Sequence, residues 1–153
     1  MVRMVWHRIL LRATVGVGIL ALSSISMAAP PAPCSLLTTA EVEQIVGKLN
    51  GPPKADQEGA ASWCDYQFAN GKDAMEVWVF PADGIDRGRK VSKKPAPVKG
   101  LGDDAFMDRG MHGLDYVSLF VKKGSTTVKF SIKETAGDED KVKVLAQKAV
   151  GRF

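Results

Sequence analysis

The sequence predicts an α+β domain in which an antiparallel sheet carries the N- and C-terminal helices on one face. Two observations support this fold class. Alternating apolar residues pair in two hairpins. One amphipathic helix precedes the first hairpin in the sequence, and another follows the second hairpin. The chain has 153 residues, and residues 34–153 suffice for one hydrophobic core. We therefore expect a single domain there, its sheet made of two hairpins plus a short strand.

The first predicted helix covers residues 39–46. Thr38 and Glu41 have the spacing of a capping box, in which each side chain accepts from the other residue's backbone N–H. Apolar residues follow at helical spacing, and Gly47 is placed to end the helix. The glycines and prolines of residues 50–61 then predict a loop.

Two registers are open for the first hairpin, whose strands flank residues 69–72. A two-residue Asn70-Gly71 turn is the stronger local signal, but it places Asp65 opposite Glu76, and like charges in that position destabilise a sheet. A four-residue loop avoids this contact, and we favour it. It pairs Phe68 with Met75, Tyr66 with Val77, Cys64 with Val79 and Trp63 with Phe80.

The middle of the chain is less regular. Residues 81–99 are expected to hold one short helical turn near residues 84–91, and a brief strand is expected at 105–107. The second hairpin runs from Leu114 to Ile132 with Gly124-Ser125 as its turn. This register brings three apolar pairs together: Val121 with Val128, Leu119 with Phe130, and Val117 with Ile132.

A terminal helix is predicted from about Glu139. Its first turn is acidic, as the helix dipole favours. One face is apolar, formed by Val142, Leu145, Ala146, Ala149 and Val150.

Residues 1–28 have the pattern of a secretory signal peptide. Basic residues precede the apolar run 13–22, which is too short to span a bilayer. Small residues at Ser26 and Ala28 predict cleavage after Ala28. We expect a periplasmic or secreted protein without a transmembrane segment, beginning with a proline-rich spacer at residues 29–33.

Removal of the signal peptide changes the net charge of the chain, and export determines which state of the two cysteines is expected. Three of the 21 bases leave with residues 1–28, so 18 bases face 17 acids and the net charge falls from +4 to +1. That balance gives no indication of nucleic-acid binding. In an oxidising compartment Cys34 and Cys64 are expected to form a disulfide. The alternatives are lipidation of Cys34, which the preceding Pro33 disfavours, and a free thiol.

No arrangement of residues points clearly to catalysis. His112 is the one histidine after residue 28, and no metal-ligand spacing or Gly-x-Ser-x-Gly motif occurs. Asp103 and Asp104 lie in a glycine-rich turn that lacks the residues of a phosphate loop. We expect no enzymatic activity, cofactor or metal. The alternative is a small envelope hydrolase that uses Asp103, Asp104 and His112.

Two surfaces are candidates for binding. One is the sheet face opposite the core, which carries Trp63, Trp78, Phe80, Tyr116 and Phe120 where polar residues are expected. Either residues 81–99 cover these aromatic side chains or they contact a partner. The other candidate is a basic loop, which is either simply solvated or contacts anionic envelope components. Its bases are Arg87, Arg89, Lys90, Lys93 and Lys94.

An ordered set of short motifs resembles a family of small exported bacterial proteins and lipoproteins of unknown function. The motifs are Cys-Ser-Leu-Leu-Thr at residues 34–38, Cys-x-Tyr at 64–66 and Gly-Leu-Gly-Asp-x-Ala-Phe at 100–106. The resemblance implies a cysteine bridge and an α+β domain like the sandwich of the photosystem extrinsic protein PsbP. Members are often lipidated at an earlier cysteine, which this chain lacks. The resemblance implies no reaction.

These observations favour an exported, non-enzymatic binding or accessory module of the cell envelope. Its partner, a protein or another envelope component, is not specified by the sequence. A third class is an inhibitor or accessory subunit of an envelope complex.

Overall fold

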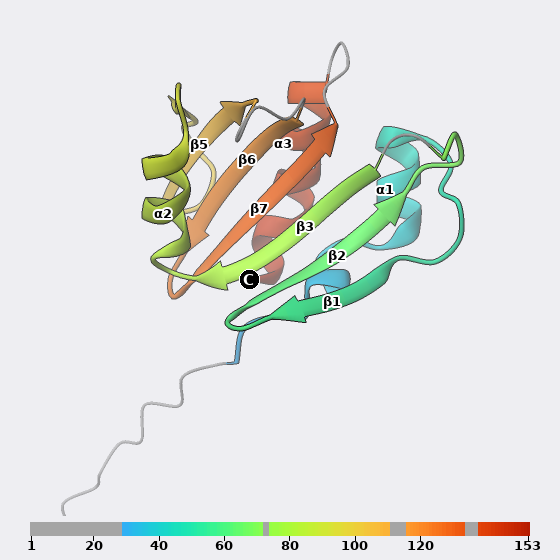
Figure 1. The fold of residues 1–153 in the computed structure, drawn as a ribbon, viewed down its shortest axis with the longest axis horizontal. Helices are drawn as coiled ribbons and strands as arrows, with labels where there is room; N and C mark the ends of the chain where they lie inside the picture. Colours follow the sequence, from blue (N-terminus) through green and yellow to red (C-terminus); the bar gives the residue numbers. More distant parts are fainter. Residues whose placement is uncertain (1–28, 72–73, 111–115, 134–137) are drawn as a thin grey trace, which may run out of the picture.

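The computed structural model describes residues 29–71, 74–110, 116–133 and 138–153, which form one antiparallel sheet and its helices. The seven strands follow the order β1-β2-β3-β7-β6-β5-β4 across the sheet (Figure 1). They are β1 (Lys54–Glu58), β2 (Ala61–Gln67), β3 (Ala74–Pro81), β4 (Ala96–Pro97), β5 (Asp104–Arg109), β6 (Tyr116–Lys123) and β7 (Thr126–Lys133). The helices are α1 (Thr39–Val46), α2 (Gly84–Val91) and α3 (Asp138–Ala149), with short 3-10 helices η1 (Pro33–Ser35) and η3 (Val150–Arg152).

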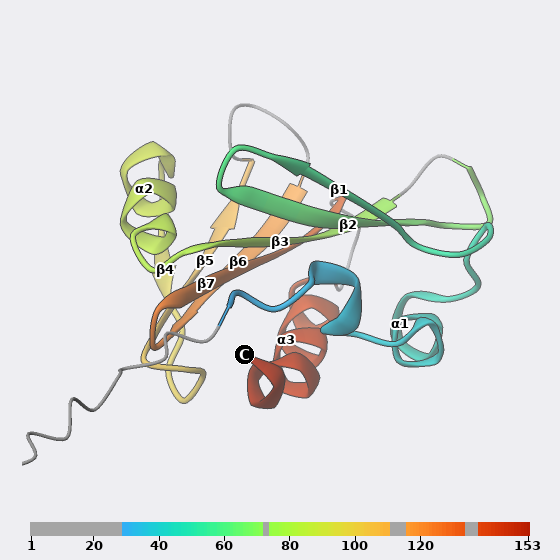
Figure 2. The ribbon, with the colours of Figure 1, turned by 90° about the horizontal axis from the view of Figure 1, so that it is seen from below.

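Helices pack on both faces of this sheet. Figure 2 shows α1 and α3 together on one face and α2 on the other. The expectation that the N- and C-terminal helices share a face is confirmed. The helix α2, which lies within residues 81–99, packs on the opposite face.

The main core lies between the sheet and the two terminal helices. The apolar face predicted for the terminal helix is buried here at Val142, Leu145, Ala146 and Ala149, while Val150 is half-buried in η3. Side chains of β2, β3, β6 and β7 meet that face from the sheet. The α+β class and the inward face of α3 therefore agree with the sequence prediction.

The helix α1 has the predicted bounds and the predicted capping box. The backbone N–H of Glu41 donates to Thr38 Oγ1 at 3.2 Å, and the N–H of Thr38 donates to Glu41 Oε2 at 2.9 Å. Gly47 ends the helix with φ of 95°, a left-handed conformation that glycine adopts without strain.

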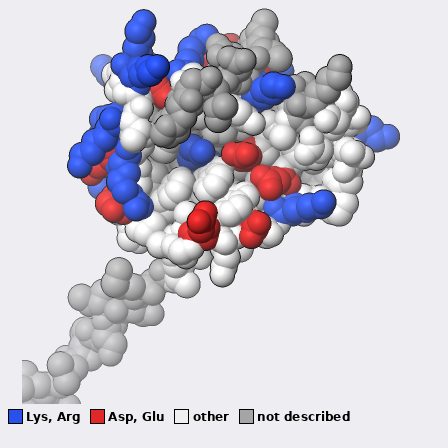
Figure 3. Space-filling model, viewed as in Figure 1, with Lys and Arg blue, Asp and Glu red and all other residues white. Residues whose placement is uncertain are grey.

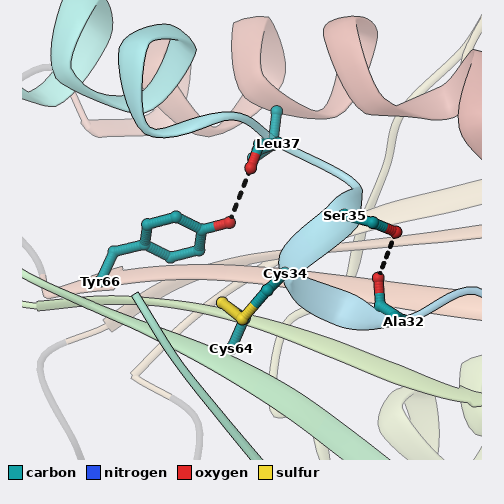
Figure 4. Close-up of a disulfide and its surroundings, with 6 residues drawn as sticks. All are labelled: Ala32, Cys34, Ser35, Leu37, Cys64 and Tyr66. Atoms are coloured by element: carbon teal, nitrogen blue, oxygen red, sulfur yellow. Dashed lines mark hydrogen bonds between the residues drawn. A yellow bond between two sulfur atoms is a disulfide. The ribbon is translucent and has the colours of Figure 1, made fainter. Parts of the chain in front are cut away.

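A disulfide joins η1 to β2, as predicted. The Cα atoms of Cys34 and Cys64 are 5.1 Å apart, within the range of ordinary disulfides. Nearby, the buried hydroxyl of Tyr66 donates to the carbonyl of Leu37 at 3.0 Å (Figure 4). The bridge and this hydrogen bond hold the segment before α1 against the sheet, on the core face.

The predicted register of the second hairpin is confirmed, with all three apolar pairs in place. The register favoured for the first hairpin was wrong. Tyr66 is paired with Met75, Cys64 with Val77 and Trp63 with Trp78, which is the register that was expected for the shorter turn.

The observed register does place Asp65 opposite Glu76. Burial, and next the charge of Glu76, raise the pKa of the Asp65 carboxyl. The same register stacks Trp63 on Trp78 with ring centroids 4.4 Å apart. Such an aromatic pair stabilises a sheet, so the stack offsets the cost of the like charges.

Two strands were not predicted. The segment expected to be a loop contains β1, which forms one edge of the sheet with all five residues exposed. The two-residue strand β4 forms the other edge. The short strand expected at residues 105–107 is longer, spanning the whole of β5. The helical turn expected at residues 84–91 is α2.

The predicted signal peptide, residues 1–28, lies outside the described residues. Among the helices of the described part, none has the length and apolar character needed to cross a bilayer.

Candidate functional site

A row of neighbouring side chains crosses the sheet face opposite the main core. Its members are direct cross-strand neighbours on five adjacent strands: Trp63, Trp78, Lys129, Phe120 and Phe106. We call this set the aromatic row. The rings of Phe106 and Phe120 stack at 4.6 Å, and Lys129 Nζ lies 4.7 Å from the centre of a Trp78 ring. The row therefore has aromatic pairs at both ends and one cation at its centre.

The helix α2 covers the β5–β6 end of the row. A Cβ added to Gly88 would lie 2.6 Å from Phe120 Cε1, and one added to Gly84 would lie 2.6 Å from Phe80 Cβ. These glycines, one turn apart, let the helix backbone rest directly on the sheet. Phe106, Phe120 and Ile85 of α2 thus form a second, smaller core.

The sequence left open whether residues 81–99 cover the aromatic side chains of this sheet face, and the structure shows that they cover some of them. Phe120 is 3% exposed, so it belongs to the small core rather than to an open surface. Trp63, Trp78, Phe80 and Tyr116 are half-buried. Residues 81–99 therefore cover one end of the predicted face and leave side chains of the other end partly accessible.

A hollow of about 450 Å³ lies beside α2 on this face, and we call it the groove. The aromatic rings of Phe80 and Phe120 and the ammonium-bearing Lys129 line it from the sheet. Val91, whose surface is 49% exposed, lines it from the end of α2. The remaining lining residues are Glu58, Ala60, Ala61, Gly84, Arg87 and Gly88.

Lys129, on β7, is the titratable residue that lines the groove from the middle strands of the sheet. Burial lowers the pKa of its ammonium group, and the charge of Glu76 partly opposes this change. Glu76 itself accepts a hydrogen bond from Trp78 Nε1 at 2.8 Å. Within the described ranges, Lys129 makes no hydrogen bond or ion pair, and its ammonium group lies over the Trp78 ring.

Charge is distributed unevenly around the groove. Figure 3, which views this face, shows basic side chains over α2 and acidic ones over the β1–β3 part of the sheet. The sheet register places Asp56, Glu58, Asp65 and Glu76 on this face. A separate hollow near those acids is lined by Asn50, Pro52, Lys54, Asp65, Gln67, Ala74 and Glu76.

The predicted basic loop divides into structural and exposed residues. Both oxygens of Asp104 accept hydrogen bonds from Arg89 Nη2, at 2.9 and 2.8 Å, and the Arg89 guanidinium lies 5.1 Å from the Phe106 ring centre. Arg87 pairs with Asp83 at 3.3 Å. Lys90, Lys93 and Lys94 are exposed. Arg89 therefore holds α2 against the sheet, whereas Arg87 and the three lysines remain exposed to solvent.

The residues of the hydrolase hypothesis do not share one set of contacts. Asp103 Oδ2 accepts a hydrogen bond from the backbone N–H of Gly124 at 2.6 Å, whereas Asp104 is bound to Arg89. His112 lies outside the described residues. Across the part of the chain that the structure describes, no cluster of three or more metal-ligating side chains occurs.

Sequence reasoning missed three features of this site: Lys129, Phe106 and the glycine pair of α2. The glycine pair could have been recognised in the sequence, because two glycines four residues apart in a short helix permit close packing of its backbone. Lys129 and Phe106 become neighbours of the tryptophans only through the register of four strand pairs.

Comparison with protein-family models, curated proteins and solved structures gives no match to this chain.

Proposed function

We propose that this chain is an exported, non-enzymatic binding module of the cell envelope that holds its ligand in the groove. The observation that carries the proposal is an apolar hollow between α2 and the sheet, beside half-buried aromatic side chains. Concave, mostly apolar hollows with a few polar groups are the usual form of small-molecule sites. Export is supported by the pattern of residues 1–28 and by the Cys34–Cys64 disulfide.

The groove is a better candidate than the basic loop. The exposed lysines of the loop border a hollow lined by Lys93, Lys94, Ala96, Met107, Arg109 and Glu139, but no aromatic ring lies among these lining residues. The groove combines two aromatic rings, aliphatic side chains and a cation in one concavity. This combination supports selective binding, whereas solvated lysines alone support weak, salt-sensitive contacts.

Two substitutions separate these surfaces. Ala60 lines the groove and Ala96 lines the hollow of the basic loop, and both residues are exposed. Ala60→Phe is expected to fill part of the groove, while Ala96→Phe is its matched control. Thermal melts of both variants establish that the fold is kept.

The test is native mass spectrometry of the three proteins purified from the periplasm. We expect a compound that co-purifies with the wild type and with Ala96→Phe, and that is lost from Ala60→Phe. Loss from Ala96→Phe with retention by Ala60→Phe would place the contact on the basic loop. The absence of any bound compound from the wild type would count against the proposal.

The same spectra test export. The intact mass should correspond to a chain that begins near Ala29, and reduction of the disulfide to two thiols should add two hydrogen atoms. A mass that retains residues 1–28, or that carries a diacylglyceryl group on Cys34, would contradict this part of the proposal.

A further inference from the structure

We propose that the groove takes a small anion with an apolar body, and that the ammonium group of Lys129 binds its anionic group. This inference rests on the proposed function and deepens it by naming the ligand class.

The apolar part of the ligand is indicated by the lining. Phe80 lines the groove with a half-buried ring, the nearly buried Phe120 forms part of its floor, and Val91 adds an exposed aliphatic side chain at the end of α2. The volume of about 450 Å³ lies within the usual range for ligands of drug size. An apolar body placed there would cover Val91 and remove apolar surface from water.

The anionic part is indicated by the position of Lys129. Its side chain is half-buried between the neighbouring Trp78 and Phe120 of the aromatic row. A lysine ammonium group has three hydrogen-bond donors. The Trp78 ring stabilises the charge but accepts no conventional hydrogen bond from these donors. A carboxylate, sulfonate or phosphate oxygen in the groove would supply the missing acceptor.

The other charges near the groove favour an anion on the α2 side. Arg87 adds a second positive charge in the lining, although Asp83 partly neutralises it. Glu58 is the acid in the lining, and it lies on the exposed edge strand β1. A cationic ligand would instead have to place its charge beside Lys129 or beside the exposed Glu58, where water screens the attraction.

The experiment compares two probes that share one apolar body. The anionic probe is 8-anilinonaphthalene-1-sulfonate, and N-phenyl-1-naphthylamine is the same body without the sulfonate. Both fluoresce more strongly when bound, so their affinities for the full mature protein can be measured directly. The variants are Lys129→Gln, Lys129→Arg and, as a control on the basic loop, the exposed Lys93→Gln.

We expect the sulfonate to bind the wild type at least about tenfold more tightly than the uncharged probe, the size of effect that one charged hydrogen bond produces. Lys129→Gln should remove this preference while leaving the affinity for the uncharged probe unchanged. Lys129→Arg should retain most of the preference, and Lys93→Gln should behave as the wild type. A urea melt of Lys129→Gln confirms that the loss is not caused by unfolding.

Equal affinities for the two probes, or a preference that survives in Lys129→Gln, would overturn the inference. If Ala60→Phe then still blocks both probes, the groove remains a binding site and only the anion class is wrong. If Ala60→Phe blocks neither probe, these probes bind elsewhere, and both the inference and the proposed use of the groove are contradicted.

Discussion

Arg152, in the short helix η3, forms a bidentate ion pair with Glu41 in the first turn of α1. Its Nη2 lies 2.7 Å from Glu41 Oε1 and its Nη1 lies 2.8 Å from Oε2. Nη1 also donates to the carbonyl of Leu36 at 2.7 Å. The helix η3 is therefore tied to the same short segment that the disulfide holds against the sheet.

This ion pair predicts a specific dependence of stability on pH. The hydrogen bond from Arg152, and next that from the Thr38 backbone, lower the pKa of Glu41 from 4.5 to about 2. Because the folded pKa is depressed, the stabilisation is complete above pH 4.5 and is lost as the pH falls toward 2. The gap in free energy of unfolding between the wild type and Glu41→Gln should therefore narrow in that window. Urea melts from pH 2 to 6 measure the gap, and parallel curves would show that Glu41 is not the titrating group.

Removal of the disulfide should destabilise the fold. The two cysteines are 30 residues apart in the sequence, and a closed loop of that length predicts a loss of about 3–4 kcal/mol in the chain-entropy model. The double variant Cys34→Ser with Cys64→Ser, compared with the oxidised wild type in urea, measures this loss. If the urea unfolding curves of the two proteins had equal midpoints and slopes, the disulfide would not restrict the unfolded chain.

The inward face of α3 can be tested with two truncations. Leu145 is fully buried, so Leu145→Ala should leave a cavity and cost about 2–4 kcal/mol of unfolding free energy. Lys143 lies on the opposite side and makes a weak ion pair with the exposed Asp140, at 3.5 Å. Lys143→Ala should cost less than about 0.5 kcal/mol. Similar losses from both variants would place the wrong face of α3 against the sheet.

Because α2 packs directly against the sheet, we expect one added methyl group in this helix to lower the stability of the fold. In Gly88→Ala the new Cβ would lie 2.6 Å from the Phe120 ring, so the helix or the ring must move. We expect a loss of about 1–3 kcal/mol, the usual cost of overpacking a core. Gly151→Ala is the control, because a Cβ there meets no atom within 4 Å. A Gly88→Ala protein as stable as the control would mean that α2 does not rest directly on Phe120.

The elements that the sequence predicted well are those specified by neighbouring residues. The capping box of Thr38 and Glu41 defines the start of α1, and the apolar pairs around Gly124-Ser125 define the second hairpin. The apolar stripe of α3 likewise lies within one short segment. Each of these signals is local, so each could be recognised without the rest of the fold.

The features that were missed depend on partners distant in the sequence. Strand β1 is polar and fully exposed, and only its pairing with β2 makes it a strand. The register of the first hairpin differs from the expected one because the stacking of Trp63 on Trp78 accompanies, and offsets, the repulsion between Asp65 and Glu76. The central position of Lys129 likewise follows from long-range strand order.

The groove can hold a ligand only if the sheet face on which it lies is open, and Trp78, the cross-strand neighbour of Lys129, reports on that face without a ligand. In a mature protein carrying Trp63→Phe, Trp78 is the remaining tryptophan. Its half-buried indole predicts acrylamide quenching intermediate between that of a core tryptophan and that of free indole. Emission that is strongly blue-shifted and shielded from acrylamide in the isolated monomer would show that the chain covers this face itself, and would contradict its use as a binding surface.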